Sequence, residues 1–341
     1  MKEIKTFVPG RVGFIGELSD LVSPYLDKNK KLIPGKCLAC RINKGIYAVS
    51  RKSQRIIYQF KKLKFECDLN ESSLLQEINN NSFYSYLCGT ILYLFRKYSV
   101  GGIDITISKM DLPIKVGLSS SAAFSLTIVK AYNELYNLKL TDDEIINCAH
   151  EGEILAGSRC GNLDYVSIMN DGLLLLTFYK DQTMIERIPL RKSLHFLVVD
   201  LNSSKNTKKI MHIFNRELSS DFTSDDILDI VGQTNEEIVY HAVDAIKNSD
   251  ITEFINCLNK AQNLMDKASG ICDEFIAPKL HIIMKDNYIK KLSCGIKSIG
   301  SGGDGSALII ANNINDLSKI KKYLKKIYGM KSIDFTIKRD I

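Results

Sequence analysis

The stretch that decides the fold is Pro113-Ile114-Lys115-Val116-Gly117-Leu118-Ser119-Ser120-Ser121-Ala122-Ala123. A glycine–serine loop leads here into a segment of small and apolar residues, which predicts a helix that ends near Tyr136. The first N–H groups of a helix have no intrahelical partner and lie at the positive end of its dipole, so they bind anions. Serine hydroxyls add donors for phosphate oxygens or ligands for Mg²⁺. We therefore predict phosphate binding by Gly117, Leu118, Ser119, Ser120, Ser121 and Ala122.

A serine cap on a core helix is the simpler interpretation of the same stretch. Three consecutive serines exceed what one helix cap requires, which favours phosphate binding. The loop is not a Walker A motif, because the Gly-Lys-Ser/Thr ending of that motif is absent.

A second glycine-containing stretch lies near the start of the chain and reads Pro9-Gly10-Arg11-Val12-Gly13-Phe14-Ile15-Gly16-Glu17-Leu18-Ser19-Asp20. It can be a strand interrupted by turn glycines. Glycine also lets a backbone approach a ligand closely, and Arg11, Glu17 and Asp20 concentrate charge beside apolar residues. Carboxylates accept hydrogen bonds from hydroxyl groups, so Glu17 and Asp20 are candidate ligands of a polyol.

A third glycine-rich stretch lies near the end of the chain and reads Ile299-Gly300-Ser301-Gly302-Gly303-Asp304-Gly305-Ser306-Ala307. Each glycine costs about 0.5–1 kcal/mol of stability relative to alanine, and a plain turn does not need so many. A backbone that wraps a substrate or a phosphate does need them. We assign Gly302, Gly303 and Asp304 to substrate binding.

Periodicity predicts an α+β chain. Apolar or alternating runs predict strands over residues 4–14, 37–50, 55–60, 103–108, 173–178, 196–201, 307–311 and 333–338. Helical periodicity covers residues 83–98, most of 225–291 and 315–328, and a capping box at Thr141 and Glu144 predicts another helix start. A polar stretch, residues 181–193, separates two apolar strands. It predicts a boundary between domains 1–185 and 186–341.

Composition narrows the class of protein. The chain has 341 residues, 45% of them hydrophobic, and no apolar run long enough to span a membrane or resemble a signal peptide. Nine scattered cysteines without paired spacing indicate reduced thiols and a cytoplasmic location. The net charge of +7 comes from dispersed lysines, and no nucleic-acid-binding motif accompanies it.

Taken together, the three stretches resemble the motifs of the GHMP kinase superfamily (galactokinase, homoserine kinase, mevalonate kinase and phosphomevalonate kinase). The superfamily carries Pro-Gly-Arg/Lys-x-x-x-x-Gly-Glu, Pro-x-x-x-Gly-Leu-Gly/Ser-Ser-Ser-Ala and Gly-x-Gly-Gly-x-Gly in this order. Here they match residues 9–17, 113–122 and 300–305. The resemblance spans nearly the whole chain. It implies a two-domain GHMP kinase fold: an N-terminal domain related to the ribosomal protein S5 domain 2-like fold, a ferredoxin-like C-terminal α/β domain, and an active site in the cleft between them.

Two finer matches are similar to galactokinases. Glu17 and Asp20 match the carboxylates of the galactokinase Glu-His-Thr-Asp, and Cys160-Gly161-Asn162-Leu163-Asp164 resembles Cys-Gly-x-x-Asp. By this resemblance Asp164 is the catalytic carboxylate and Arg11 the cation that neutralises charge. Ser121 and Glu153 would hold Mg²⁺, with Glu151 a rival for Glu153.

Departures from the galactokinase pattern leave the acceptor open. Leu18 replaces a sugar-contacting histidine, Asp304 stands where the family often has glycine, and a Lys-rich insertion (residues 23–31) lengthens the loop after Asp20. The stretch 202–209 contains Asn-Thr-Lys, as in mevalonate kinases. The resemblance thus implies a Mg²⁺- and ATP-dependent kinase of a sugar or sugar derivative, giving a sugar 1-phosphate. A mevalonate kinase-like enzyme for a non-sugar alcohol and a catalytically silent sugar and ATP sensor are the alternatives.

Partners follow from the same resemblance. We expect ATP and a small-molecule acceptor, no nucleic acid, no membrane, and a monomer or homodimer.

Overall fold

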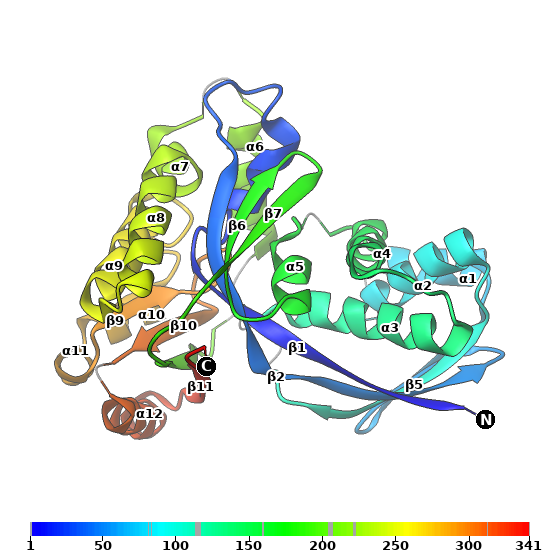
Figure 1. Ribbon diagram of the computed structural model, residues 1–341. Coiled ribbons are helices and arrows are strands. Elements are labelled where there is room, and N and C mark those ends of the chain that lie inside the picture. The colour runs from blue at the N-terminus through cyan, green and yellow to red at the C-terminus, as the bar shows by residue number, and fades with distance from the viewer. Residues whose placement is uncertain are drawn as a thin grey trace. The chain divides into compact units, whose positions relative to one another are not determined.

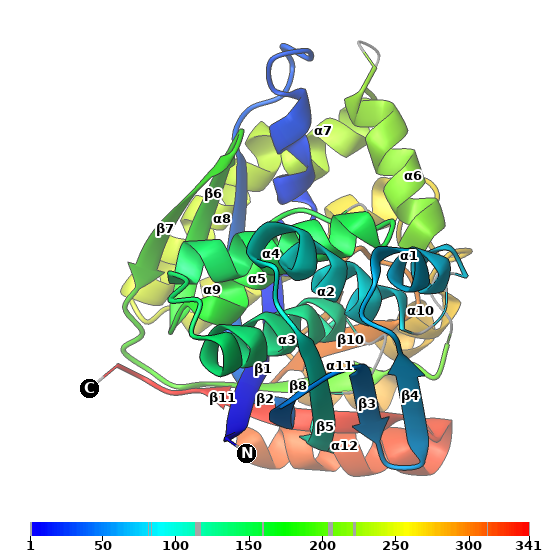
Figure 2. The same cartoon turned by 90° about the vertical axis from the view of Figure 1, so that its right-hand side faces the viewer.

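The computed structural model describes residues 2–80, 82, 84–112, 117–158, 160–203, 207–220, 223–311 and 313–340 (Figures 1 and 2). The chain forms two compact units. The first comprises Met1–Gly10, Asn43–Ile114 and Ser119–Asn170, and the second Arg11–Ile42, Lys115–Leu118 and Asp171–Ile341. Two long strands, β1 (Glu3–Ile15) and β2 (Gly35–Ser53), contribute residues to both units. The predicted boundary at residue 185 falls inside a strand, β7 (Gln182–Ile188).

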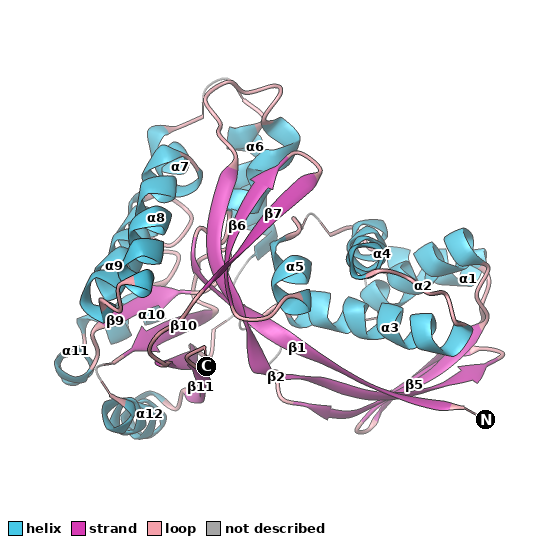
Figure 3. Cartoon of the chain, in the orientation of Figure 1, coloured by secondary structure: helices cyan, strands magenta, loops and turns pink. Residues whose placement is uncertain are grey.

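The first unit is a helical layer on a mixed sheet (Figure 3). Its elements are β3 (Ile56–Phe60), β4 (Leu63–Cys67), α1 (Glu71–Asn79), α2 (Ser85–Tyr98), β5 (Gly102–Met110), α3 (Ser120–Tyr136), α4 (Asp142–Leu155) and α5 (Leu163–Met169), with the first part of β1 and the second part of β2. Its strand order is β4-β3-β5-β2, with β3 and β5 parallel. Tyr58 on β3 meets Phe124 on α3 edge-on, with ring centroids 5.7 Å apart, so α3 packs directly on the sheet.

Helices α2 and α4 approach each other through glycine. A Cβ on Gly152 would lie 2.7 Å from Thr90 Oγ1, and one on Gly89 would lie 2.4 Å from the Gly152 carbonyl oxygen. Only glycine permits this backbone contact. The contact sets the position of α4 relative to α2 at Gly152, the residue before Glu153.

The second unit contains an antiparallel sheet with the order β11-β8-β10-β9. Its elements are η1 (Ser19–Tyr25), β6 (Leu173–Tyr179), β7, β8 (Leu194–Asp200), α6 (Thr207–Leu218), α7 (Asp225–Val231), α8 (Gln233–Lys247), α9 (Ile251–Lys267), α10 (Pro278–Lys285), α11 (Asn287–Leu292), β9 (Gly295–Ser298), β10 (Ser306–Ile310), α12 (Ile314–Tyr328) and β11 (Lys331–Ile337), with the remaining parts of β1 and β2. When β8, β9, β10 and β11 are numbered 1 to 4 along the chain, the strands lie side by side in the sheet in the order 4-1-3-2. This is the ferredoxin-like arrangement that the family resemblance implied.

Strand β8 is buried on both faces. Phe196 packs against Phe14 of β1 (5.0 Å between ring centroids), which also contacts Phe254 of α9. The alternate residues Leu197 and Val199 belong to a separate apolar cluster that includes residues of α10 and α12. This two-sided burial explains why the β8 sequence is continuously apolar rather than alternating.

Most of the strands and several of the long helices were predicted correctly from the sequence, and seven other elements were missed. Strands β1, β2, β3, β5, β6, β8, β10 and β11 and helices α2, α3, α4 and α12 lie where the sequence placed them. The missed elements are η1, β4, α1, α5, β7, α6 and β9. Among the described residues, none of the helices has the length and apolar character needed to cross a bilayer.

The capping box at the start of α4 makes a testable contribution to stability. The Thr141 hydroxyl accepts from the Glu144 N–H (3.3 Å), and the Glu144 carboxylate accepts from the Thr141 N–H (2.8 Å). Thr141→Ala should lower the free energy of unfolding by about 1 kcal/mol, measured by urea denaturation with circular dichroism. Ser224→Ala is the control, because Ser224 occupies the N-cap of α7 without a side-chain capping bond. Equal losses in both variants would contradict the assignment.

Candidate active site

The serine loop enters α3 in an unusual geometry. Ser119 is the N-cap residue but has a left-handed backbone (φ 59°), and its side chain makes no capping bond. Its hydroxyl oxygen is buried without a hydrogen-bond partner among the described residues. The helix start thus combines uncapped N–H groups with a buried hydroxyl, which is the donor set of an anion site. The preceding residues 113–116 of the predicted motif lie outside the described residues.

Glu153 is a buried carboxylate on α4, with 2% of its surface exposed. Ser125 of α3 donates a hydrogen bond to its Oε1 (3.3 Å), and Tyr165 and Ser121 make further side-chain hydrogen bonds to it. Burial raises the pKa of Glu153 to about 7, a rise that the Tyr165 bond opposes and the charge of Asp164 increases. The structure therefore brings together Ser121, Glu153 and Asp164, three residues that the sequence had assigned to metal binding and catalysis.

The donor set around Glu153 fits Mg²⁺. Mg²⁺ prefers oxygen ligands and is usually held by one or two protein groups plus substrate phosphates. Glu153 and Ser121 supply a carboxylate and a hydroxyl, and the described residues contain no cluster of three or more His, Cys, Asp or Glu side chains that would suit another metal. The rival carboxylate, Glu151, is 42% exposed and lies beside His150.

Asp164 lies in the first turn of α5 and is partly buried. A carboxylate in this position interacts favourably with the helix dipole. The next residue, Tyr165, is 1% exposed, and its hydroxyl lies 3.5 Å from the Cys160 sulfur. Sequence reasoning missed Tyr165; its place directly after the predicted catalytic aspartate was the available signal.

In the second unit, the loop after β1 is tied to β2. Gly16 has φ +81°, and a Cβ there would lie 2.0 Å from the Lys36 carbonyl oxygen, so no other residue fits. The same carbonyl oxygen accepts hydrogen bonds from the Ser19 hydroxyl (2.7 Å) and the Asn235 amide (2.9 Å). These contacts fix the turn that contains Glu17 and leads directly to Asp20 in η1.

Segments of all three glycine stretches meet within the second unit. The Arg11 guanidinium donates to the Gly117 carbonyl oxygen (2.7 Å), and the Arg11 N–H donates to the Leu118 carbonyl oxygen (3.3 Å). A Cβ on Gly117 would lie 3.0 Å from the carbonyl oxygen of Ile299, the first residue of the third stretch. Arg11, which the sequence predicted to be catalytic, therefore also holds the serine loop through two hydrogen bonds.

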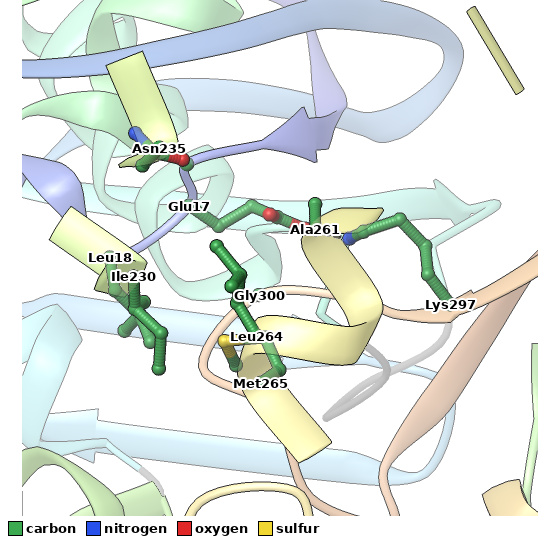
Figure 4. A pocket seen from close by; sticks show the side chains of 10 residues that line it. Glu17, Leu18, Ile230, Asn235, Ala261, Leu264, Met265, Lys297 and Gly300 are labelled. Atoms are coloured by element: carbon green, nitrogen blue, oxygen red, sulfur yellow. Dashed lines mark hydrogen bonds and ion pairs between the residues drawn. The ribbon is translucent and has the colours of Figure 1, made fainter. Parts of the chain in front are cut away.

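Glu17 forms an ion pair with Lys297 of β9, with 2.6 Å between the carboxylate and the ammonium. The two side chains are 8% and 4% exposed. Figure 4 shows them pointing toward one another at the lining of a pocket. Leu18, Ile230, Leu264 and Met265 form its apolar wall. Lys297 was not recognised from the sequence, although a lone lysine in an apolar strand before a glycine loop was visible.

Asp304 fixes the third glycine loop. The carboxylate is 4% exposed and accepts from the N–H groups of Lys279 (3.1 Å) and Leu280 (2.9 Å) at the start of α10. Gly300, Gly302 and Gly303 all have positive φ, so the loop takes a backbone path that other residues rarely adopt. Asp304 thus positions the loop, and substrate contact by Asp304, Gly302 and Gly303 stays a prediction.

Comparison with known proteins agrees with this architecture. Residues 85–172, which include the serine loop, Glu153 and Asp164, match the family described as GHMP kinases N terminal domain. The chain is 24% identical to a galactokinase of Thermotoga maritima over 95% of this chain and 94% of that protein. It is 26% identical to a galactokinase of Pyrococcus furiosus over 99% of this chain and 98% of that protein.

Solved structures share the fold. A Lactococcus lactis galactokinase complexed with galactose has a TM-score of 0.79 at 17% identity, covering 99% of this chain and 94% of that chain. A Methanococcus jannaschii mevalonate kinase has a TM-score of 0.73 at 21% identity, covering 99% of both chains. Residues 85–172 thus match the N-terminal domain of GHMP kinases, and the chain is similar to galactokinases along nearly its whole length. These homologues indicate an ATP-dependent kinase that is galactokinase-like.

The Glu17–Lys297 pair should be essential to the stability of the second unit. Lys297→Met leaves Glu17 as an uncompensated buried charge, which should cost about 3–5 kcal/mol of unfolding free energy, measured by urea denaturation. Lys64→Met is the matched control, because Lys64 forms an exposed pair with Glu66 and should cost at most about 1 kcal/mol.

A second variant tests the cause of that loss. Adding Glu17→Gln to Lys297→Met removes the uncompensated charge and should recover much of the lost stability. No recovery would show that packing of the lysine, rather than the ion pair, accounts for the destabilisation.

Proposed function

We propose that the protein transfers the γ-phosphoryl group of Mg·ATP to a hydroxyl group of a sugar or sugar derivative, giving a sugar 1-phosphate. The observation that carries the sugar acceptor is the pair of carboxylates, Glu17 and Asp20, held on a rigid turn in a chain similar to galactokinases along its length. Carboxylates that accept hydrogen bonds suit a ligand made of hydroxyl groups.

The serine loop is the proposed phosphate site. Uncapped N–H groups at the start of α3 and the Ser119 hydroxyl would donate to phosphate oxygens. Glu153 and Ser121 would hold Mg²⁺ through their oxygens. Mg²⁺ bound there supplies neutralisation of the charge on the β- and γ-phosphates.

Asp164 and Arg11 have the proposed chemical roles. Asp164 orients the acceptor hydroxyl and takes its proton as the new O–P bond forms, while the bond between the γ-phosphorus and the bridging oxygen breaks and its electron pair stays on ADP. Arg11 stabilises the negative charge that develops on the phosphoryl oxygens. A guanidinium has five N–H donors and keeps its charge, so the bond to Gly117 is compatible with this role.

A mevalonate kinase-like activity is the second candidate. Two observations favour it: the likeness in fold to a mevalonate kinase, and Leu18, whose side chain joins the apolar core where galactokinases are expected to have a sugar-contacting histidine. The Asn-Thr-Lys pattern cannot be compared, because residues 204–206 and the Lys208 side chain lie outside the described residues. Against it, mevalonate carries a carboxylate, and the charge of Lys297 is already compensated by Glu17.

A substrate panel tests the acceptor. ATP consumption should be measured with aldoses, uronic acids, heptoses, inositol and mevalonate. We expect turnover with an aldose or its acid and a phosphorylated anomeric oxygen, identified by ³¹P nuclear magnetic resonance, with galactose itself a poor substrate because Leu18 replaces histidine. Activity on mevalonate with none on any sugar would refute the sugar assignment.

Asp164→Asn tests the proposed base. The change removes one charge while keeping size and much of the hydrogen bonding. General-base assistance contributes typically about 10²–10⁴-fold, so kcat should fall at least about a hundredfold. ATP affinity, measured by calorimetry on the same variant, should change far less, because the phosphates bind at the serine loop. Near-normal turnover would show that Asp164 has a structural role only.

A further inference from the structure

Tyr165 is a buried polar residue that the reaction scheme above does not use. It lies on α5 immediately after Asp164, is 1% exposed, and makes a side-chain hydrogen bond to Glu153 on α4. The Cys160 sulfur lies 3.5 Å from its hydroxyl, and the His150 ring packs edge-on with centroids 5.5 Å apart. Its hydroxyl is therefore fixed by neighbours on several sides.

The direction of the Tyr165–Glu153 bond follows from chemistry. A tyrosine phenol carries its proton at neutral pH, because its ordinary pKa is about 10. A protonated phenol beside a carboxylate acts as the donor. Ser125 (3.3 Å to Oε1) and Ser121 also bond to this carboxylate, so three hydroxyls from α3 and α5 surround one group on α4.

The three hydroxyls do not have equal roles. Ser121 is the proposed second metal ligand, so its oxygen would turn to the metal when Mg²⁺ binds. Ser125 and Tyr165 would then remain as the partners that fix the orientation of the carboxylate. Of these two, tyrosine is the more rigid anchor, since its hydroxyl lies at the end of a planar ring enclosed by α4 and by the Cys160 segment.

We propose that Tyr165 is a positioning residue that holds the Glu153 carboxylate in the orientation required for metal binding. The inference rests on the proposed function, because it assumes that Glu153 is a metal ligand. Partners that orient a metal-binding side chain typically contribute about 10–100-fold to metal affinity. Tyr165 also joins α5, which carries the proposed base, to α4, which carries the metal carboxylate.

Tyr165→Phe tests the proposal because it removes only the hydroxyl. Mn²⁺ is the probe, and its binding in the presence of the non-hydrolysable nucleotide AMPPNP is measured by electron paramagnetic resonance. We expect Mn²⁺ affinity to fall about 10–100-fold and the Mg²⁺ concentration for half-maximal turnover to rise in parallel. Affinity for metal-free AMPPNP should not change.

Tyr132→Phe is the matched control. Tyr132 is a fully buried tyrosine of α3 in the same unit, and its hydroxyl has no hydrogen-bond partner among the described residues. It should leave Mn²⁺ affinity unchanged. A loss of metal affinity in both variants would show a general packing effect and overturn the proposal.

Glu153→Gln separates the failure of this proposal from the failure of the metal assignment. If Tyr165 acts through Glu153, Tyr165→Phe should have no further effect on Mn²⁺ binding in the Glu153→Gln background. Unchanged affinity in Tyr165→Phe, beside reduced affinity in Glu153→Gln, would refute the positioning role alone. Unchanged affinity in Glu153→Gln would refute the metal site and the inference with it.

Ser125→Ala keeps the proposal testable if Tyr165→Phe does not fold. In Ser125→Ala the carboxylate loses its other orienting donor but keeps Tyr165. The proposal expects a smaller loss of Mn²⁺ affinity in this variant than in Glu153→Gln, because Tyr165 still holds the carboxylate. A loss as large as that of Glu153→Gln would overturn it.

Discussion

The burial of Glu153 is the constraint on which the first unit depends. A carboxylate removed from water loses its hydration, and the loss is tolerated only when hydrogen bonds replace it. Here the replacements come from Ser121 and Ser125 on α3 and from Tyr165 on α5. Three helices must therefore converge on one side chain, and the glycine contact between α2 and α4 sets the position of the residue before it. The hydrogen bonds to this one buried carboxyl group thus tie the serine-loop helix and the segment that carries Asp164 to α4.

The second unit also contains buried carboxylates, which are stabilised by an ion pair and by backbone N–H donors. Glu17 is compensated by Lys297, and Asp304 is compensated by two N–H groups of α10. Each of these carboxylates lies in one of the glycine stretches. Because glycine gives a loop little conformational preference of its own, a buried charge with an obligatory partner is an effective way to select one loop conformation. In this unit, the charges order the loops, and the glycines allow the backbone to come close.

Elements with a local sequence signal could be predicted, whereas those that depend on contacts between distant residues could not. The capping box at Thr141 and the apolar run of β8 are local signals, so both elements were predictable. Strand β7 is mostly polar and exposed, and its residues were interpreted as part of a domain boundary, because only pairing with β6 makes them a strand. Helix α5 has seven residues, too few for a periodic signal. The partner of Glu17 lies 280 residues away, and no local pattern predicts such a pair.

The exchange of a histidine for Leu18 has a structural consequence for the acceptor. Leu18 contributes its side chain to the apolar cluster of the second unit, so this position offers no hydrogen bond to a ligand. In the proposed function, recognition of the acceptor at this turn is therefore left to Glu17 and Asp20. Glu17 is already paired with Lys297, yet a carboxylate has about four acceptor positions, so one ammonium does not exhaust it. The ion pair holds the Glu17 carboxylate in one orientation, and its remaining acceptor positions can take hydrogen bonds from hydroxyl groups. In the proposed function, the turn therefore binds hydroxyl groups of the acceptor rather than a carboxylate, whose charge would meet a lysine that Glu17 has already neutralised.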